Sequence, residues 1–443
     1  MIKEPLVVRE FDKLVVGDPS GNSFADNVKK ISPKHFDSLK SLYDNEDNDD
    51  DASRFLRIGH NKKDGDYISV KKYVGTIHTS TGLQIEVLPK LDLSVSNSGE
   101  RTKDIFIEML KSMDNFYGKT LNKSDLNVNN MDLYEVYIKM YIDEVVTLVK
   151  HGLKSGYVRT EDNLNVCKGK ILFQQNIRYN FAHQERFYVE YDEFSADRPE
   201  NRIIKATLYK LQRISSDFEN VKRIRQCLAY FETVHESLNY DADFAKISIN
   251  RGNQEYEDLM IWSKIFLKDE SFDVFSGETR ARALLFSMDK LYESYVAKKL
   301  REAVKKNGKN WVVKTQSTEK HLFDKPTPSF TLRPDIVIKR KGDKPVILDT
   351  KWKEIRNTPK NNYGISQSDM YQMYAYATKY GAEEVWLLYP MNNAMNGKNK
   401  KDKQIWFSSI KPLIKVTAFF VDIEYIDNPK INDSIYGLID EIN

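Results

Sequence analysis

Alternating apolar and polar positions predict strands in the first part of the chain. Leu6-Val7-Val8 is a short apolar run, and residues 67–91 alternate β-branched with polar residues on both sides of Thr79-Ser80-Thr81-Gly82. A period of two is typical of a half-buried strand, and the glycine favours a tight hairpin turn. With one helix over residues 33–42, the pattern predicts a β-rich N-terminal module over residues 1–100.

In the middle of the chain, the apolar residues are mostly spaced as in helices. Residues 101–155 predict two helices, and residues 156–195 predict strands and a turn that include the stretch 169–180. Further helices are expected at three places: from Pro199, over residues 217–237 and over residues 254–268.

Charged and turn-forming residues interrupt the helical pattern at Asp269–Glu278, where we expect a domain boundary. The interruption separates a mixed helical and β stalk region, residues 101–270, from a C-terminal domain, residues 271–443. In the C-terminal domain the predicted order is long helix, strand, hairpin, helix, strand and further strands.

The long helix predicted over Arg280–Lys306 is apolar on nearly every side, so its middle should be buried. Glu293 projects from that middle and would share a stripe with Phe286. Because a buried, unpaired carboxylate is costly, we expect Glu293 to meet a basic partner such as Lys351 or to serve a metal ion.

The hairpin predicted within Thr331–Lys353 carries the chemistry. If Lys341-Gly342-Asp343 is its loop, Arg340 pairs with Lys344, and counting outward places Asp335 opposite Asp349. Cross-strand Cβ atoms lie about 5 Å apart, where like charges repel each other. A divalent cation between the two carboxylates would relieve that repulsion.

Lys351 points to the same face as Asp349, roughly 7 Å along the strand. Asp335, Asp349 and the backbone carbonyl of Thr350 offer oxygen ligands for Mg²⁺ or Mn²⁺, and Lys351 can act on a water molecule. Taken singly, each of these residues fits a structural role better than a catalytic one: Asp335 and Lys351 as surface strand residues and Asp349 as a turn residue at a strand end. Their combination predicts a metal-and-water site suited to phosphodiester hydrolysis.

A helix over Ser366–Tyr380 follows the hairpin and places Gln372 and Tyr376 four residues apart on one face. Val385–Tyr389 is a short, fully apolar run of the kind found in buried strands. We expect the tryptophans of this half to be core or sheet residues: Trp311, Trp352 and Trp406.

Composition says little about what the protein binds. The 443 residues include 68 basic and 65 acidic side chains, for a net charge of +3, so the overall charge does not identify a partner. Two cysteines exclude a disulfide framework, and the sequence shows neither an apolar signal core nor a membrane span. These features predict a cytoplasmic protein without a membrane partner.

Two motif-like stretches are rejected as ligand sites. The acidic run at residues 44–51 lacks the glycine and glutamate of a calcium loop, because Asp49 and Phe55 stand there. Tyr117-Gly118-Lys119-Thr120 lacks the earlier glycine of a P-loop, because Met113 occupies that position. We therefore predict that this chain binds no nucleotide itself.

Pro334-Asp335, followed by Asp349-Thr350-Lys351, resembles the signature of PD-(D/E)XK nucleases. Gln372 through Tyr376 resembles the QxxxY motif of the RecB-related subclass. The wider chain resembles the McrC family, the nuclease subunits of the 5-methylcytosine-specific McrBC restriction system. That wider resemblance lies in three stretches: residues 82–90, 169–178 and 200–205.

The resemblance implies an α+β, mixed fold with a restriction-endonuclease-like C-terminal α/β core, in which helices flank a mixed sheet. Asp335 and Asp349 would hold the metal ion with the Thr350 carbonyl, and Lys351 would act on the attacking water. Glu293 would be the acid, and possible metal ligand, contributed by the helix. Gln372 would orient DNA or the metal shell, whereas Tyr376 would pack.

The resemblance also implies partners. The N-terminal half would dock into an McrB-like AAA+ hexamer and stimulate its GTP hydrolysis, and the C-terminal half would cut double-stranded DNA. Two alternatives stay open: a nuclease subunit of a system that reads a defined unmodified sequence, and a non-catalytic adaptor that activates the motor.

Local charge is consistent with DNA contact. Residues 298–320 carry eight Lys or Arg against two Glu, and residues 396–415 carry six Lys against one Asp. Basic stretches beside a nuclease core can neutralise phosphates. Solvated helix ends and loops would have the same composition.

Overall fold

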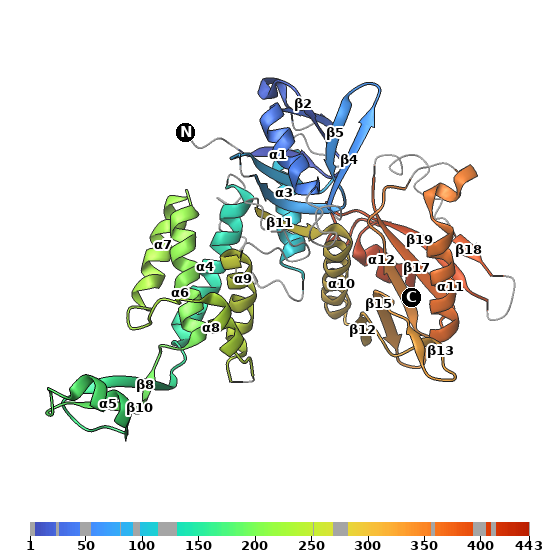
Figure 1. Cartoon of the computed structure of the whole chain (residues 1–443). Helices are drawn as coiled ribbons and strands as arrows, with labels where there is room; N and C mark the ends of the chain where they lie inside the picture. Colours follow the sequence, from blue (N-terminus) through green and yellow to red (C-terminus); the bar gives the residue numbers. More distant parts are fainter. Residues whose placement is uncertain are drawn as a thin grey trace. The chain divides into compact units, whose positions relative to one another are not determined.

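A computed structural model describes the following residues of the chain: 5–23, 26–44, 55–79, 81–91, 98–113, 131–250, 252–268, 282–355, 359–392, 405–408 and 413–442. The chain forms two compact units (Figure 1). Unit 1 comprises Met1–Phe116 and Asp273–Asn443, and unit 2 comprises Tyr117–Phe272. The acidic run, the rejected P-loop stretch and the expected boundary at 269–278 lie outside the described residues, except for Asp44 at the end of a helix.

The N-terminal part of unit 1 is rich in β-strands. Its elements are β1 (Leu6–Arg9), β2 (Lys13–Val16), η1 (Pro19–Gly21), β3 (Val28–Ile31), α1 (Pro33–Asp44), β4 (Leu56–Asn61), β5 (Gly65–Val70), β6 (Tyr73–His78), β7 (Gln84–Leu88) and α3 (Ser98–Leu110). The strands β3-β2-β5-β4 form one sheet, packed against α1 (Figure 1). The predicted strand at residues 6–8 and helix at 33–42 are confirmed as β1 and α1.

A second sheet has the order β1-β7-β6-β11. The predicted hairpin is confirmed, because β6 and β7 pair antiparallel with Ile77 opposite Ile85. Gly75, at φ 136°, allows close approach of strand β11 (Arg282–Ser287), since a Cβ here would lie 2.1 Å from the Leu284 carbonyl oxygen. A side chain at this position would force the two strands apart.

The helix predicted over Arg280–Lys306 is wrong in its first turns. Its described beginning, residues 282–287, is strand β11, which pairs with β6 from Arg282↔His78 to Ser287↔Tyr73. Helix α10 runs only over Met288–Lys306. An apolar run fits either a buried strand or a buried helix. Here it forms a strand because it pairs with β6, which is distant in the sequence. Glu293 therefore shares no helical stripe with Phe286, and it is half-buried rather than buried.

The C-terminal part of unit 1 is a mixed sheet with flanking helices. Its elements after α10 are β12 (Trp311–Thr315), β13 (His321–Phe323), β14 (Ser329–Thr331), β15 (Ile336–Arg340), β16 (Val346–Thr350), η4 (Pro359–Gly364), α11 (Gln367–Tyr380), β17 (Glu384–Pro390), β18 (Ile405–Phe407), β19 (Lys415–Val421) and α12 (Ile435–Ile442). The sheet order is β12-β15-β16-β17-β19-β18. Strand β17 pairs in parallel with β16 and β19, and the remaining pairs are antiparallel.

The register of the central hairpin is as predicted. Ile336 lies opposite Leu348, and Ile338 lies opposite Val346. Extending this ladder by one position places Asp335 opposite Asp349. The loop is longer than the predicted three residues, because β16 begins only at Val346. Strand β15 still ends at Arg340, so the two extra loop residues lie before β16, and the pairs from Ile336↔Leu348 to Ile338↔Val346 keep the predicted register.

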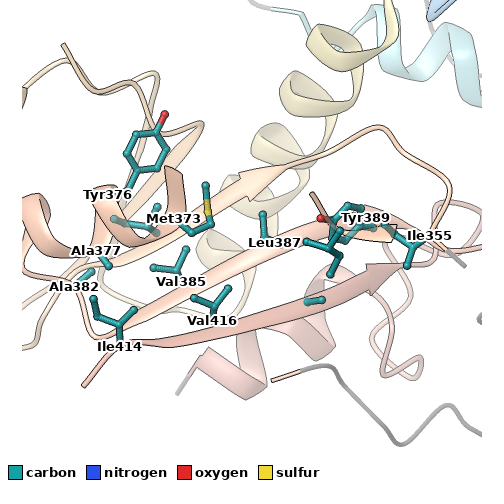
Figure 2. Packing of buried hydrophobic residues seen from close by; sticks show 13 residues of the cluster. Ile355, Met373, Tyr376, Ala377, Ala382, Val385, Leu387, Tyr389, Ile414 and Val416 are labelled. Carbon is teal, nitrogen blue, oxygen red and sulfur yellow. The ribbon is translucent and has the colours of Figure 1, made fainter. Parts of the chain in front are cut away.

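Helix α11 packs on the sheet through an apolar cluster. Met373, Tyr376 and Ala377 belong to one buried cluster with Val385 and Leu387 of β17 (Figure 2). The three tryptophans are core or sheet residues as expected: Trp406 packs at the edge of this cluster, Trp352 is 5% exposed, and Trp311 begins strand β12. The predicted helix over 366–380 and the buried strand over 385–389 are confirmed, and together they fix the position of Gln372.

Unit 2 combines helices with a small sheet of order β8-β10-β9. Its elements are α4 (Leu133–His151), β8 (Gly156–Leu164), β9 (Lys170–Ile171), α5 (Phe173–Asn180), β10 (Phe187–Ser195), α6 (Pro199–Ile214), α7 (Phe218–Ala229), α8 (Tyr240–Lys246), η3 (Gln254–Tyr256) and α9 (Glu257–Lys268). Residues 173–180 form a helix rather than the expected strand. Asn176 explains the difference, because its side chain accepts hydrogen bonds from the Tyr188 N–H (2.8 Å) and from Asn180 (2.9 Å).

The fold is thus mixed α and β, as the sequence predicts. The functional division at residues 100 and 270 stays a prediction. In the described part of the chain, no helix combines the length and apolar character needed to cross a bilayer.

Candidate active site

The two aspartates lie where the central hairpin opens. Asp335 precedes β15, and its Oδ2 accepts hydrogen bonds from the backbone N–H and the hydroxyl of Thr350, each 2.7 Å long. Asp349 lies near the end of β16 and is 1% exposed. Thr350 thus orients the first carboxylate, while the strand fixes the second beside it.

Lys351 is the positive charge of the site. Its Nζ lies 2.5 Å from Oδ2 of Asp349 and donates a hydrogen bond to Oε1 of Gln372 at 3.3 Å. Gln372 Nε2 in turn contacts the Tyr376 hydroxyl at 2.8 Å, and that hydroxyl donates to the Arg333 carbonyl at 3.0 Å. The glutamine and tyrosine of the QxxxY motif therefore form a polar chain that holds the lysine.

Glu293 reaches the site from α10. Its Oε1 accepts a hydrogen bond from the Gln316 side chain at 2.5 Å, and the Gln316 backbone N–H donates to the Asp335 carbonyl at 3.0 Å. Gln316 has a φ of 47°, which is uncommon outside glycine. The residue links the helix to the start of β15. The expected pairing of Glu293 with a basic partner is replaced by this amide contact.

The carboxyl groups of the site repel one another. Burial and the Asp335 charge raise the pKa of Asp349 to about 7, and the same two causes raise the pKa of Glu293 to about 7. Burial also raises the pKa of Asp335, although the Thr350 hydrogen bonds oppose the shift. Burial lowers the pKa of Lys351, but the neighbouring carboxylates outweigh burial and raise it overall. The site has more negative charge than one ammonium group neutralises.

The structure brings together the residues singled out from the sequence: Glu293, Asp335, Asp349, Thr350, Lys351 and Gln372. Sequence reasoning missed Gln316 and the hydroxyl of Thr350. It expected Tyr376 only to pack, yet this side chain, 4% exposed, also bonds Gln372. The spacing of four residues between the glutamine and the tyrosine of a QxxxY pattern is a signal for that bond, whereas Gln316 belongs to no motif.

The oxygen donors suit a hard divalent cation such as Mg²⁺ or Mn²⁺. A cation between Asp335 and Asp349 would offset the Asp335 charge that helps to raise the pKa of Asp349, and it would also favour the ionised form of Asp335, whose pKa burial raises. Within the described ranges, however, no three His, Cys, Asp or Glu side chains converge with metal-binding spacing. Glu293 is therefore not placed as a third ligand, and that role stays a prediction.

The fold and sequence have relatives. The structure resembles a McrC-containing assembly from Thermococcus gammatolerans, described as a half-complex from a tetradecameric assembly of McrB AAA+ hexamers with bound McrC. The TM-score is 0.64 at 18% identity, over 99% of this chain and 100% of that chain. A second structure, the McrBC complex of the same organism, aligns with a TM-score of 0.44 at 20% identity, over 68% of this chain and 88% of that chain.

No curated protein matches the sequence. A family model described as "McrBC 5-methylcytosine restriction system component" matches residues 68–390, which is most of the chain and includes the hairpin, Glu293 and Gln372. The chain belongs to this family of McrBC restriction system components.

Proposed function

We propose that the chain is the DNA-cutting subunit of a McrBC-type restriction complex, a divalent-metal-dependent endodeoxyribonuclease. The observation that supports this most is the arrangement of Asp335, Asp349 and Lys351 at one end of a hairpin, with the lysine 2.5 Å from Asp349. Phosphodiester hydrolysis needs a place for a cation and a group that acts on water, and this set provides both.

Asp335, Asp349 and the carbonyl of Thr350 would hold the ion. When bound, Mg²⁺ or Mn²⁺ supplies charge neutralisation at the phosphate and lowers the pKa of a bound water. Thr350 keeps Asp335 in place by its two hydrogen bonds, so this carboxylate need not reorganise.

Lys351 would orient the attacking water and stabilise the negative charge that develops on the phosphate. Gln372 and Tyr376 would position the ammonium group through the chain of hydrogen bonds that ends at the Arg333 carbonyl. Glu293, whose pKa is raised by burial and by the Asp335 charge, would be the group from α10 that takes up or releases a proton during the reaction.

A partner surface is proposed on the β8–β10 sheet and α5 of unit 2. This apolar docking surface consists of side chains that are 53–83% exposed: Tyr157, Val166, Phe173, Ile177, Tyr179, Phe181 and Phe194. Tyr157 and Phe194 contact each other with ring centroids 5.5 Å apart, and exposed apolar side chains gathered on one small sheet and helix suit a partner that covers them. By analogy with the McrB hexamers that bind McrC in the similar assembly, the partner would be an AAA+ hexamer that hydrolyses GTP itself.

The adaptor alternative explains the docking surface but not the site. A protein that only activates a motor has no need of two neighbouring aspartates held with a lysine. Whether recognition depends on 5-methylcytosine, as the family description suggests, or on an unmodified sequence would depend mainly on the partner.

The experiment compares Asp349→Asn with Asp343→Asn in the full chain, combined with an McrB-type partner, GTP, Mg²⁺ and methylated DNA. Asp343 lies in the exposed loop of the same hairpin and serves as the matched control. The first variant should lose cleavage by more than about 100-fold and still stimulate GTP hydrolysis, while the control keeps both. Cleavage by Asp349→Asn at the wild-type rate would refute the proposal.

A further inference from the structure

Unit 1 has a cavity of about 580 Å³ outside the nuclease site. One wall is a face of the sheet β3-β2-β5-β4, and the other wall contains the junction between β11 and α10. Four cationic side chains line it, Lys13, Arg57, Lys71 and Lys72, against one carboxylate, Asp289. Lys72 pairs with Asp289, and Lys13 pairs with Asp64 just outside the lining, so the cavity and this neighbour together have an excess of two positive charges.

The cations are arranged by the strand register. Ser69 pairs with Lys13 on one side and with Arg57 on the other, so these residues form one row across three strands. Alternate residues of a strand share a face, which also places Tyr67 on it. The neighbouring residue Ile68 is fully buried on the opposite face. Lys13 also contacts Asp64 Oδ2 at 3.2 Å and lies over the Tyr67 ring, so a bound phosphate would share this ammonium group with Asp64. Arg57 is exposed, and cations spaced across neighbouring strands are suited to an extended anion.

Aromatic side chains complete the lining: Phe11, Tyr67 and Tyr73. Phe11 is 50% exposed and has a φ of 64°, a strained conformation for a bulky residue. An exposed aromatic ring beside a row of cations is the combination by which proteins hold single-stranded nucleic acid, since bases stack on the ring and phosphates meet the cations.

Two sets of contacts join the cavity to the nuclease site. Asp289 lines the cavity from the first turn of α10, and Glu293 lies one turn further along the same face. Lys72 contacts Asp289 at 3.0 and 3.1 Å, which fixes the helix start against the end of β5. A strand held in the cavity would thus lie about one helical turn from the site, roughly 6 Å along the axis.

The second link is the turn after β1. Glu10 is fully buried and accepts hydrogen bonds from Trp352 Nε1 at 3.2 and 3.0 Å, while the next residue, Phe11, lines the cavity. Trp352 directly follows Lys351. The aromatic ring of the cavity and the lysine of the nuclease site are therefore held by one continuous set of contacts.

We propose that this cavity binds an unpaired segment of a DNA strand, with phosphates on Lys13 and Arg57 and a base on Phe11, and so holds that strand beside the nuclease site. The choice of DNA rests on the proposed nuclease function. The exposed Phe11 ring favours an unpaired strand over a duplex, because only a base that has left its duplex can stack on this ring.

The test measures binding of a fluorescent single-stranded oligonucleotide to the full-length protein in chelator, so that no cleavage occurs. Arg57→Gln and Phe11→Asn should each raise the dissociation constant about tenfold. Asparagine is chosen at position 11 because it tolerates a positive φ. The dissociation constant of Arg57→Lys should stay near that of the wild type. Arg57→Gln should also make the plot of log binding constant against log salt concentration less steep, by about 0.7.

Lys62→Gln is the matched control, because Lys62 is exposed in the β4–β5 turn and does not line the cavity. Equal affinities of the wild type, Arg57→Gln and Phe11→Asn proteins would overturn the proposal. So would competition by a polyglutamate peptide or a mononucleotide as effective as that of the oligonucleotide. Because this experiment measures binding and not cleavage, its result can be interpreted even if the protein proves to have no nuclease activity.

Discussion

Lys351 donates a hydrogen bond to Gln372, 3.3 Å away, while its other close neighbour is the carboxylate of Asp349. The lysine of the hairpin is therefore positioned by a residue of α11, which packs on the sheet through Met373 and Ala377 (Figure 2). We propose that the glutamine acts in this site through the lysine, in addition to any contact with DNA or the metal shell.

Removing the glutamine should therefore impair the lysine. Gln372→Ala is expected to lower the cleavage rate about 10- to 100-fold, the usual effect of losing a positioning group. Gln372→Glu keeps an acceptor for Lys351 and should recover part of the rate. Single-turnover cleavage measures both variants, and a Gln372→Ala rate equal to that of wild type would contradict the positioning role.

Tyr376 should matter less. Tyr376→Phe keeps the buried ring and removes the hydroxyl that bonds Gln372 and the Arg333 carbonyl. We expect a loss of about 1 kcal/mol in the free energy of unfolding and a cleavage rate between those of wild type and Gln372→Ala. Denaturant unfolding and cleavage assays check the two parts. A stronger cleavage defect than that of Gln372→Ala would assign the hydroxyl a direct role.

Glu10 should make stability depend on pH. Burial raises its pKa from 4.5 to about 8, although hydrogen bonds from Lys90 and Trp352 oppose the shift. In the unfolded chain the group ionises at the lower value. Its contribution to stability is thus complete below pH 4.5 and is lost as pH rises towards 8, by at most about 1.4 kcal/mol per pH unit.

Glu10→Gln removes this ionisation. Thermal unfolding of both proteins between pH 5 and 8.5 should show the wild type losing stability relative to the variant as the pH rises, a window that the pKa of about 8 sets. Parallel curves across that range would show that Glu10 is not the titrating group.

Asp197 should stabilise unit 2. Its carboxylate accepts two hydrogen bonds from the Arg202 side chain, at 2.7 and 2.5 Å. The same carboxylate accepts a hydrogen bond from the backbone N–H of His235 at 2.9 Å and contacts the His235 ring at 2.6 Å. Asp197→Asn should cost about 2 kcal/mol in the free energy of unfolding. Proteolysis or hydrogen exchange within residues 131–268 would detect the loss. Unchanged protection there would contradict this role.

The partner surface makes a separate prediction. Phe181→Ser, at a side chain 83% exposed, should weaken binding of the AAA+ partner and stimulation of its GTP hydrolysis by about tenfold. Leu238→Ser is the control, because Leu238 is 99% exposed in the same unit but lies outside the docking surface. Equal effects of the two substitutions on binding would show that the docking surface has no special role.

Much of the candidate site could be predicted because its information is local. The register of β15 with β16 follows from strand alternation around one turn, so the pairing of Asp335 with Asp349 could be counted from the sequence. Helical spacing likewise put Gln372 and Tyr376 on one face. Short-range geometry of this kind leaves few alternatives.

The rest depends on contacts that are distant in the sequence. Strand β11 was predicted as helix because only its pairing with β6, some 200 residues earlier, distinguishes the two. Gln316 contacts Glu293 and Asp335 because its backbone adopts a positive φ, and no residue pattern in the sequence predicts that conformation. The cavity similarly requires Phe11 and Asp289 to meet across two sheets.

The most direct measurement is single-turnover DNA cleavage by the complete complex as Mg²⁺ is titrated, with wild type, Asp335→Asn and Lys351→Ala. We predict that wild-type cleavage is absent in chelator and rises with Mg²⁺, while both variants stay at background although GTP hydrolysis is unchanged. Cleavage that needs no divalent cation, or Asp335→Asn cleaving as wild type does at every Mg²⁺ concentration, would contradict a metal-dependent nuclease site at this hairpin.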